Sequence, residues 1–131
     1  MSDTATVAAA PATPTKQTYT GSCHCGAVRY EAEAEIGGAL ACNCSICSKK
    51  GTLLALTGEE DFRLIEGADK LAEYRFNKHV IGHLFCTTCG VEPFARGVRP
   101  DGARMVALNV RCLDGVELDS LPLRHFDGRS R

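Results

Sequence analysis

Seven of the eight cysteines in this chain fall into three short clusters. The clusters are Cys23-His24-Cys25, Cys42-Asn43-Cys44-Ser45-Ile46-Cys47 and Cys86-Thr87-Thr88-Cys89. Cysteine thiolates at these spacings bind zinc, with four protein ligands in structural sites and three in catalytic sites, where the fourth position is left for water or substrate. Because seven ligands divide into four and three, the sequence predicts one zinc ion that holds structure and one that does chemistry.

The two outer pairs, Cys23 with Cys25 and Cys86 with Cys89, complement each other as a set of four ligands. Two residues between the later cysteines permit a tight turn that aims both thiolates at one ion, and the following glycine lets backbone N–H groups approach sulfur. We expect the earlier pair to lie in a strand, where residues i and i+2 share a face. The ion would then join an early strand to a late one, and a cross-link stabilises most when it closes a long loop.

The middle cluster, Cys42, Cys44 and Cys47, spans only six residues. A segment this short can wrap three sides of a tetrahedron but scarcely four, which predicts an open coordination position. Two alternatives stay open: a single zinc ion that takes four of the seven sulfurs, and an iron–sulfur cluster, although the spacing matches neither common ferredoxin run. Cys112 has no partner in range, which favours a small core thiol over a further ligand.

The four histidines are weaker candidates for ligands or bases. None lies at ligand spacing to another histidine, so a solvated or hydrogen-bonded imidazole is the favoured interpretation of each. They are His24, His79, His83 and His125.

The composition limits the classes of protein to which this chain can belong. The chain has 131 residues, 44% of them hydrophobic and none of them tryptophan, which fits one compact domain. Its hydrophobic core would be modest, so a bound metal would help to stabilise the fold. The 15 basic and 16 acidic residues create no field that would attract nucleic acid or an anionic membrane. No stretch approaches the roughly 20 apolar residues of a membrane helix. We therefore expect a soluble protein whose partner is a small molecule and whose oligomeric state the sequence leaves open.

The first 16 residues are rich in alanine, threonine and proline and lack the features of a secretory signal. We predict a disordered tail over residues 1–16 and a single zinc domain over residues 17–131. Closely spaced cysteines suit a metal in a reducing compartment better than disulfides, which favours the cytoplasm.

Hydrophobic periodicity predicts an all-β domain of short antiparallel strands. Apolar residues alternate with charged ones from Val28 to Glu35, the pattern of a strand with one face in water. A short helical turn is predicted at Ser45 to Lys50. Further strands are predicted at Thr52 to Thr57, Phe62 to Glu66, Leu71 to Phe76, Val80 to Phe85 and Met105 to Val110.

Four motifs resemble those of a known family. They are Gly21 to Val28, Cys42 to Cys47, Phe85 to Gly90 followed by Pro93 and Phe94, and Asn109 to Gly115. Together, from about Thr18 to Gly128, they resemble the glutathione-dependent formaldehyde-activating enzyme family, whose domain is shared with centromere protein V. The resemblance implies a zinc-ribbon-like β-tent fold. It also implies a structural zinc on Cys23, Cys25, Cys86 and Cys89, and a catalytic zinc on Cys42, Cys44 and Cys47.

The activity that the resemblance implies is addition of glutathione to formaldehyde, giving S-hydroxymethylglutathione, formally carbon–sulfur lyase chemistry in reverse. Three thiolates weaken an ion as a Lewis acid, so we expect activation of the thiol rather than of the carbonyl. The carboxylates of the tripeptide need cations, and the candidates are Lys49 with Lys50, and Arg96 with Arg99, each of which can also be a solvated surface residue.

Two other functions stay open. One is a non-catalytic zinc module that binds a protein, and the other is thiol redox chemistry or metal buffering by the middle cluster.

Overall fold

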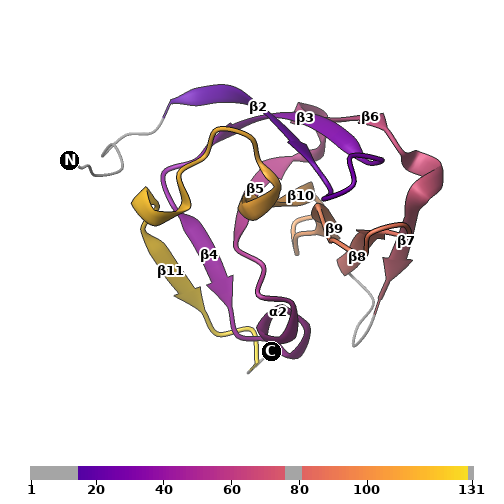
Figure 1. Cartoon of the computed structure of the whole chain (residues 1–131). Helices are drawn as coiled ribbons and strands as arrows, with labels where there is room; N and C mark the ends of the chain where they lie inside the picture. Colours follow the sequence, from indigo (N-terminus) through magenta and orange to yellow (C-terminus); the bar gives the residue numbers. More distant parts are fainter. Residues whose placement is uncertain (1–14, 76–80, 130–131) are drawn as a thin grey trace.

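The computed structural model describes residues 15–75 and 81–129, which form two β-sheets and a few short helices (Figure 1). Residues 1–14 of the predicted tail, the ends of two predicted strands at Phe76 and Val80, and His79 lie outside the described residues. The first strand begins at Lys16, one residue before the predicted start of the domain. No helix among the described residues is long and apolar enough to span a membrane.

The smaller sheet has three antiparallel strands in the order β2-β3-β6. Their bounds are β2 Lys16–Ser22, β3 Arg29–Glu35 and β6 Phe62–Glu66. The alternation predicted for the central strand is confirmed, because Tyr30, Ala32 and Ala34 are buried while the residues between them are not. Because the alternation has a period of two residues, one face of the sheet points toward the core.

The larger sheet has seven strands in the order β11-β4-β5-β10-β9-β8-β7. Their bounds are β4 Ala39–Cys42, β5 Leu54–Gly58, β7 Leu71–Tyr74, β8 Ile81–Cys86, β9 Phe94–Val98, β10 Arg104–Asn109 and β11 Leu123–Phe126. All pairings are antiparallel except that of β11 with β4, which is parallel. Figure 1 shows the smaller sheet lying across the top of the larger one.

The helices are all short. Helix α2 spans Ser45–Lys50, as predicted, and four 3₁₀ turns follow. The turns are η1 Glu59–Asp61, η2 Ala68–Lys70, η3 Val110–Cys112 and η4 Leu118–Ser120. The prediction of a mostly β fold of short antiparallel strands is therefore confirmed.

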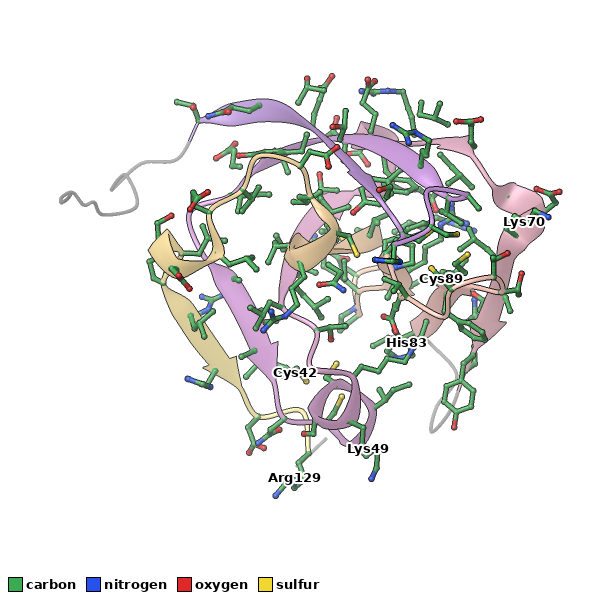
Figure 2. The ribbon with its side chains drawn as sticks, in the orientation of Figure 1. Cys42, Lys49, Lys70, His83, Cys89 and Arg129 are labelled. Atoms are coloured by element: carbon green, nitrogen blue, oxygen red, sulfur yellow. The ribbon has the colours of Figure 1, made fainter. Side chains whose placement is uncertain are left out.

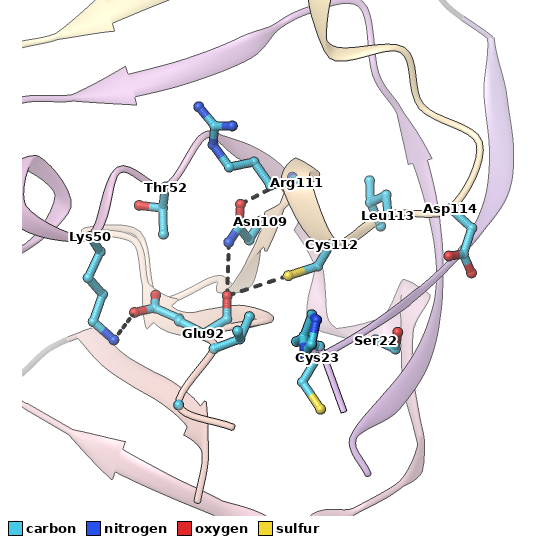
Figure 3. A pocket seen from close by; sticks show the side chains of 13 residues that line it. Ser22, Cys23, Lys50, Thr52, Glu92, Asn109, Arg111, Cys112, Leu113 and Asp114 are labelled. Atoms are coloured by element: carbon cyan, nitrogen blue, oxygen red, sulfur yellow. Dashed lines mark hydrogen bonds and ion pairs between the residues drawn. The ribbon is translucent and has the colours of Figure 1, made fainter. Parts of the chain in front are cut away.

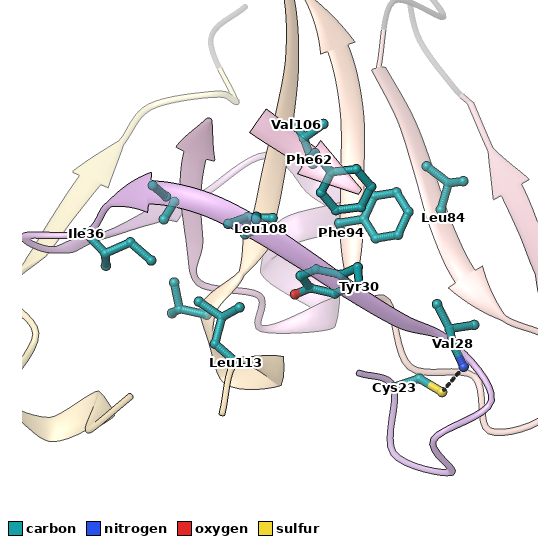
Figure 4. Packing of buried hydrophobic residues seen from close by; sticks show 14 of the residues in the cluster. Cys23, Val28, Tyr30, Ile36, Phe62, Leu84, Phe94, Val106, Leu108 and Leu113 are labelled. Atoms are coloured by element: carbon teal, nitrogen blue, oxygen red, sulfur yellow. Dashed lines mark hydrogen bonds between the residues drawn. The ribbon is translucent and has the colours of Figure 1, made fainter. Parts of the chain in front are cut away.

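Three aromatic rings form the centre of the core between the two sheets (Figure 4). The centroids of Tyr30 and Phe62 lie 5.3 Å apart, and Phe94 lies 4.6 Å from Phe62 and 5.6 Å from Tyr30. The Tyr30 hydroxyl donates a hydrogen bond of 3.2 Å to the carbonyl of Pro93. Aromatic packing of this kind stabilises beyond the area it buries, and it fixes the start of β9 beneath β3.

Candidate metal centres and the cavity between them

The two outer cysteine pairs meet at one point. The Sγ atoms of Cys23, Cys25, Cys86 and Cys89 all lie within 4.8 Å of one another. The Cys25 sulfur is 3.6 Å from that of Cys23 and 3.7 Å from that of Cys86. Zinc–sulfur bonds of about 2.3 Å in a tetrahedron require sulfurs about 3.8 Å apart. The four thiols therefore have the spacing that a zinc ion needs.

The first pair does not lie in a strand, so that part of the prediction is wrong. Strand β2 ends at Ser22, and the chain turns through Cys23 and Cys25 before β3 begins at Arg29. The turn is closed by a 3.1 Å hydrogen bond from the Cys23 amide to the Val28 carbonyl. Because β2 and β3 pair antiparallel, the chain must reverse here, and the reversal brings the sulfurs together in place of a shared strand face.

Backbone amides stabilise thiolates in this four-cysteine centre. The N–H of Val28 donates to the Cys23 sulfur at 3.3 Å, and the N–H of Thr88 donates to the Cys86 sulfur at 3.3 Å. A hydrogen bond from the N–H of Val91 is the main cause that lowers the pKa of Cys89 to about 6. Thiolate is the form that binds metal, so the turn geometry prepares the site for an ion.

The middle cluster forms a second, separate group of sulfurs. Cys42 ends β4, Cys44 is the N-cap of α2 and Cys47 lies within that helix, so the chain wraps around one point. Their three Sγ atoms lie within 4.8 Å of one another, and no further His, Cys, Asp or Glu of the described residues joins them. The spacing fits one ion with three protein ligands, which is the arrangement of catalytic zinc sites.

The pKa values of the three thiols differ from one another, as they do in the four-cysteine centre, where the pKa of Cys25 is raised to about 11 and that of Cys89 is lowered to about 6. Burial is the main cause that raises the pKa of Cys47 to about 12, and a hydrogen bond with Thr52 opposes the rise. Burial also raises the pKa of Cys42. Burial acts the same way on Cys44, but hydrogen bonds from the backbone and from the neighbouring thiols outweigh it and lower its pKa.

The C-terminal segment covers one side of the three-cysteine centre. Asn43 anchors it: its amide N–H donates to the Phe126 carbonyl at 3.1 Å, its Nδ2 donates to Asp127 at 3.1 Å, and its Oδ1 accepts from the Arg129 amide at 2.9 Å. A Cβ atom at Gly128 would lie 2.6 Å from the Cys42 sulfur and 3.1 Å from Cys44 Cβ. Only glycine leaves the cluster undisturbed, and sequence spacing gave no signal for this contact.

A cavity of about 690 Å³ lies between the two centres (Figure 3). Three of the four motifs contribute to its walls, and the motif Cys42 to Cys47 does not. The lining residues are Ser22, Cys23, His24, Lys50, Thr52, Gly90, Val91, Glu92, Asn109, Arg111, Cys112, Leu113 and Asp114. Small-molecule sites occupy about 300–1,000 Å³, so the volume suits a metabolite of tripeptide size.

A buried carboxylate is the centre of the polar wall of this cavity. The side chain of Glu92 is only 4% exposed, and its Oε2 lies 3.3 Å from Nδ1 of His83. Its Oε1 lies 2.9 Å from Nζ of Lys50, which gives this buried oxygen a charged partner. Its backbone carbonyl accepts from Nδ2 of Asn109 at 3.0 Å and from the Cys112 thiol at 3.9 Å.

Cys112 belongs to neither group of sulfurs, as predicted, but it is only half-buried and lines the cavity instead of joining the core cluster. Burial is the main cause that raises its pKa to about 11. The described histidines are not in either sulfur group: His24 lines the cavity, His83 contacts Glu92 and His125 is exposed on β11.

Of the four cations predicted as candidates to bind carboxylates, Lys50 lines the cavity, whereas Lys49, Arg96 and Arg99 do not. Lys49 is exposed on α2 and points away from the body of the protein (Figure 2). The guanidinium of Arg96 lies 5.4 Å from the centroid of Phe94, and Arg99 forms a 2.8 Å ion pair with Asp101. The second cation of the lining, Arg111, was not among the predicted candidates.

The fold and the two groups of sulfurs define a small, mostly β protein with two cysteine centres, one of four ligands and one of three. Residues 18–125 match the model of the glutathione-dependent formaldehyde-activating enzyme family, and this chain belongs to that family. Its fold is also similar to the crystal structure of a protein from Rhodobacter sphaeroides, with 34% identity, a TM-score of 0.69, and coverage of 80% of this chain and 99% of that one.

Proposed function

We propose that this protein is a zinc enzyme that forms and cleaves the carbon–sulfur bond of a glutathione–aldehyde adduct, with formaldehyde as the aldehyde. The observation that carries the proposal is the three-cysteine centre, whose sulfurs lie within 4.8 Å of one another with no fourth candidate ligand among the described residues. Family membership supports the reaction type, and the cavity beside the centre supports a substrate larger than formaldehyde.

Zinc bound at this centre would supply thiol activation, because it would lower the pKa of a thiol that binds it and so provide a nucleophile at neutral pH. The residues that would hold it are Cys42, Cys44 and Cys47. In the synthetic direction, the glutathione sulfur attacks the carbon of formaldehyde, a carbon–sulfur bond forms, and the carbonyl double bond becomes a C–O single bond. The thiol proton ends on that oxygen, so the product is S-hydroxymethylglutathione and no oxidant or reductant is needed.

The chain itself contributes position rather than further acid–base groups. Helix α2 fixes Cys44 and Cys47 with a 2.9 Å hydrogen bond from the Ser48 amide to the Cys44 carbonyl. Thr52 is buried, contacts the Cys47 thiol and also lines the cavity, which supports a substrate path from the cavity to the centre. Holding a thiol and an aldehyde together in this way converts a bimolecular step into an effectively unimolecular one.

The test compares the wild type with Cys44→Ser. The wild type should contain two zinc ions per chain and should accelerate exchange between glutathione and S-hydroxymethylglutathione, measured by NMR exchange spectroscopy to separate it from the spontaneous reaction. The variant should contain one zinc ion, keep its circular dichroism spectrum and lose the acceleration. An unchanged exchange rate in this variant would refute the open-site mechanism.

The same samples separate the other functions. A metal-buffering or redox role predicts release of the second zinc under mild peroxide, since thiolate oxidation removes the ligands. An enzyme whose second zinc survives such treatment, and whose exchange rate depends on Cys44, fits catalysis.

A further inference from the structure

We propose that the ion pair between Lys50 and Glu92 positions the three-cysteine centre. The pair joins the last residue of α2 to the segment that follows the turn of the four-cysteine centre. Helix α2 contains Cys47 and has Cys44 as its N-cap, so two of the three sulfurs depend on where the helix lies. The inference rests on one part of the proposed function, which is that the three-cysteine centre binds zinc, and it does not depend on the substrate.

Helix α2 is too short to hold its own position. It has six residues, whereas isolated helices shorter than about 12–15 residues are marginal in water. Among the six described residues of the helix, only Cys47 is buried, so apolar packing contributes little to its placement. Polar contacts at its two ends must therefore fix the helix, and Asn43 provides those at the N-terminal end.

The C-terminal end of the helix is tied closely to Cys47. Gly51 ends the helix in the left-handed conformation, with φ of 69°, and its amide donates a 2.9 Å hydrogen bond to the Cys47 carbonyl. Lys50 lies between these two residues in the same turn. A displacement of Lys50 therefore moves the backbone that carries the Cys47 sulfur.

Glu92 is a fixed partner because it is held beside the four-cysteine centre. It follows Cys89 by three residues, and its Oε2 lies 3.3 Å from Nδ1 of His83, which precedes Cys86 by three residues on β8. The two side chains therefore flank the turn that carries this pair of ligands. They are only 4% and 7% exposed, so the carboxylate has little freedom to follow the helix if the helix moves.

The ion pair has the features of a firm contact. Oε1 of Glu92 lies 2.9 Å from Nζ of Lys50, whose side chain is 29% exposed (Figure 3). The ammonium group also lies 5.3 Å from the centroid of the Phe85 ring, directly before Cys86 in the sequence. Separating a buried pair leaves an uncompensated charge, which costs more than the loss of an exposed pair. The contact therefore holds the end of α2 against the end of β8.

The fourth sequence motif joins the same two segments in parallel. Nδ2 of Asn109 donates to the Glu92 carbonyl at 3.0 Å, and Nε of Arg111 donates to the Gly51 carbonyl at 3.1 Å. The motif contains no ligand of either sulfur group, so these contacts give it a structural part in the same arrangement. They also keep α2 near the sheet when the ion pair is removed, and the centre should then bind metal more weakly rather than lose it.

The experiment measures the affinity of the protein for its second zinc, by competition of the zinc-loaded protein with a chromophoric chelator. Lys50→Met should bind the second zinc about tenfold more weakly than the wild type and keep the first, since changes around metal ligands typically cost ten- to hundredfold. Glu92→Gln should show the same loss. The double variant should be no weaker than either single variant, because the effects of residues that act through one contact are not additive.

Cobalt in place of the second zinc reports the geometry of the centre. Co²⁺ bound by thiolates absorbs visible light, and the absorption depends on how the ligands surround the ion. In Lys50→Met the spectrum should change, whereas Lys50→Arg keeps a charge beside Glu92 and should restore the spectrum and most of the affinity. A loss of overall stability alone would leave the spectrum of the folded, cobalt-loaded protein unchanged.

Lys49→Met is the matched control. It makes the same change on the same helix and removes the same charge from its last turn, but the side chain that it replaces points away from the body of the protein (Figure 2). This variant should keep the wild-type affinity for the second zinc. An equal loss in Lys49→Met would overturn the inference, because charge at the helix end would then set the affinity.

The remaining outcomes separate the inference from the proposed function. Wild-type affinity in Lys50→Met would overturn the inference and leave the proposed function standing. If Lys50→Met does not fold, the double variant decides, since it leaves no buried carboxylate unpaired, and wild-type affinity there would overturn the inference equally. A wild type that binds only one zinc ion would instead refute the proposed function.

Discussion

The two cysteine centres differ most in how far along the chain their ligands lie. In the four-cysteine centre, Cys25 and Cys86 are 61 positions apart, and Cys23 and Cys86 are buried within the main core. In the three-cysteine centre the ligands span six residues, from the end of β4 into α2. A long-range centre acts on the fold because it closes a large loop, whereas a local one leaves the rest of the chain almost unconstrained. The difference supports the proposed division, in which the first centre contributes stability and the second performs chemistry.

The largest effect should follow removal of a ligand from the four-cysteine centre. Cys86→Ser leaves three sulfurs for an ion that joins the β2–β3 turn to the end of β8, and structural zinc sites contribute their binding energy to folding. We expect a loss of at least about 3 kcal/mol in the free energy of unfolding, a large part of the stability of a small domain. Urea denaturation followed by circular dichroism measures it. A fully cooperative transition at the wild-type midpoint would contradict the structural role.

The same change in the three-cysteine centre should affect stability much less. Cys44→Ser removes zinc that a six-residue segment can also bind in the unfolded chain, and binding to both states reduces the stabilisation of the folded one. We expect a loss of about 1 kcal/mol together with loss of the second zinc, measured by the same denaturation and by metal analysis. A loss as large as that of Cys86→Ser would remove the contrast between the centres.

The sequence predicts the ligands of both centres because the spacing within each outer pair and within the middle cluster is local. It predicts α2 for the same reason, since the helix follows directly from the cysteine loop. It does not predict β4 and β11, since a parallel pair joined by residues more than 80 positions apart leaves no periodic signal in four-residue strands.

The choice between Lys49 and Lys50 shows most clearly what cannot be predicted from the sequence. Both follow Cys47 on one short helix, and nothing local distinguishes them. Glu92, more than 40 positions away, pairs with Lys50 and holds it at the cavity, while Lys49 is exposed. Long-range pairing decides which side chain is available to a ligand, and spacing contains no information about it.

An added methyl group can disrupt the three-cysteine centre without replacing any of its ligands. In Gly128→Ala the new Cβ would lie 2.6 Å from the Cys42 sulfur, so either the C-terminal segment or the sulfur must move. We expect a ten- to hundredfold weaker affinity for the second zinc, typical of changes around metal ligands, measured by competition with a chromophoric chelator. The first zinc should remain. Gly58→Ala is the matched control, since its Cβ meets only the carboxyl group of the exposed Glu60.

The smallest predicted effect concerns the contacts that link the two centres through Glu92. Burial, the largest contribution, raises the pKa of Glu92, but contacts with His83 and Lys50 outweigh it and hold the pKa below 4.5. A carboxyl group with a lowered pKa stabilises the fold above its unfolded pKa and loses that contribution only as pH falls through the folded one. Glu92→Gln should therefore cost about 1–3 kcal/mol at neutral pH.

The pH dependence tests the cause of that cost. Because Glu92 stays ionised well below neutrality, the difference in unfolding free energy between the wild type and Glu92→Gln should not shrink between pH 7.5 and about pH 5.5. Glu117→Gln, a change at an exposed residue before η4, should cost nothing measurable across the same range. A difference that already disappears by pH 6 would mean that the Glu92 carboxylate is not held by these contacts, and the two centres would then be joined only through the backbone and the core.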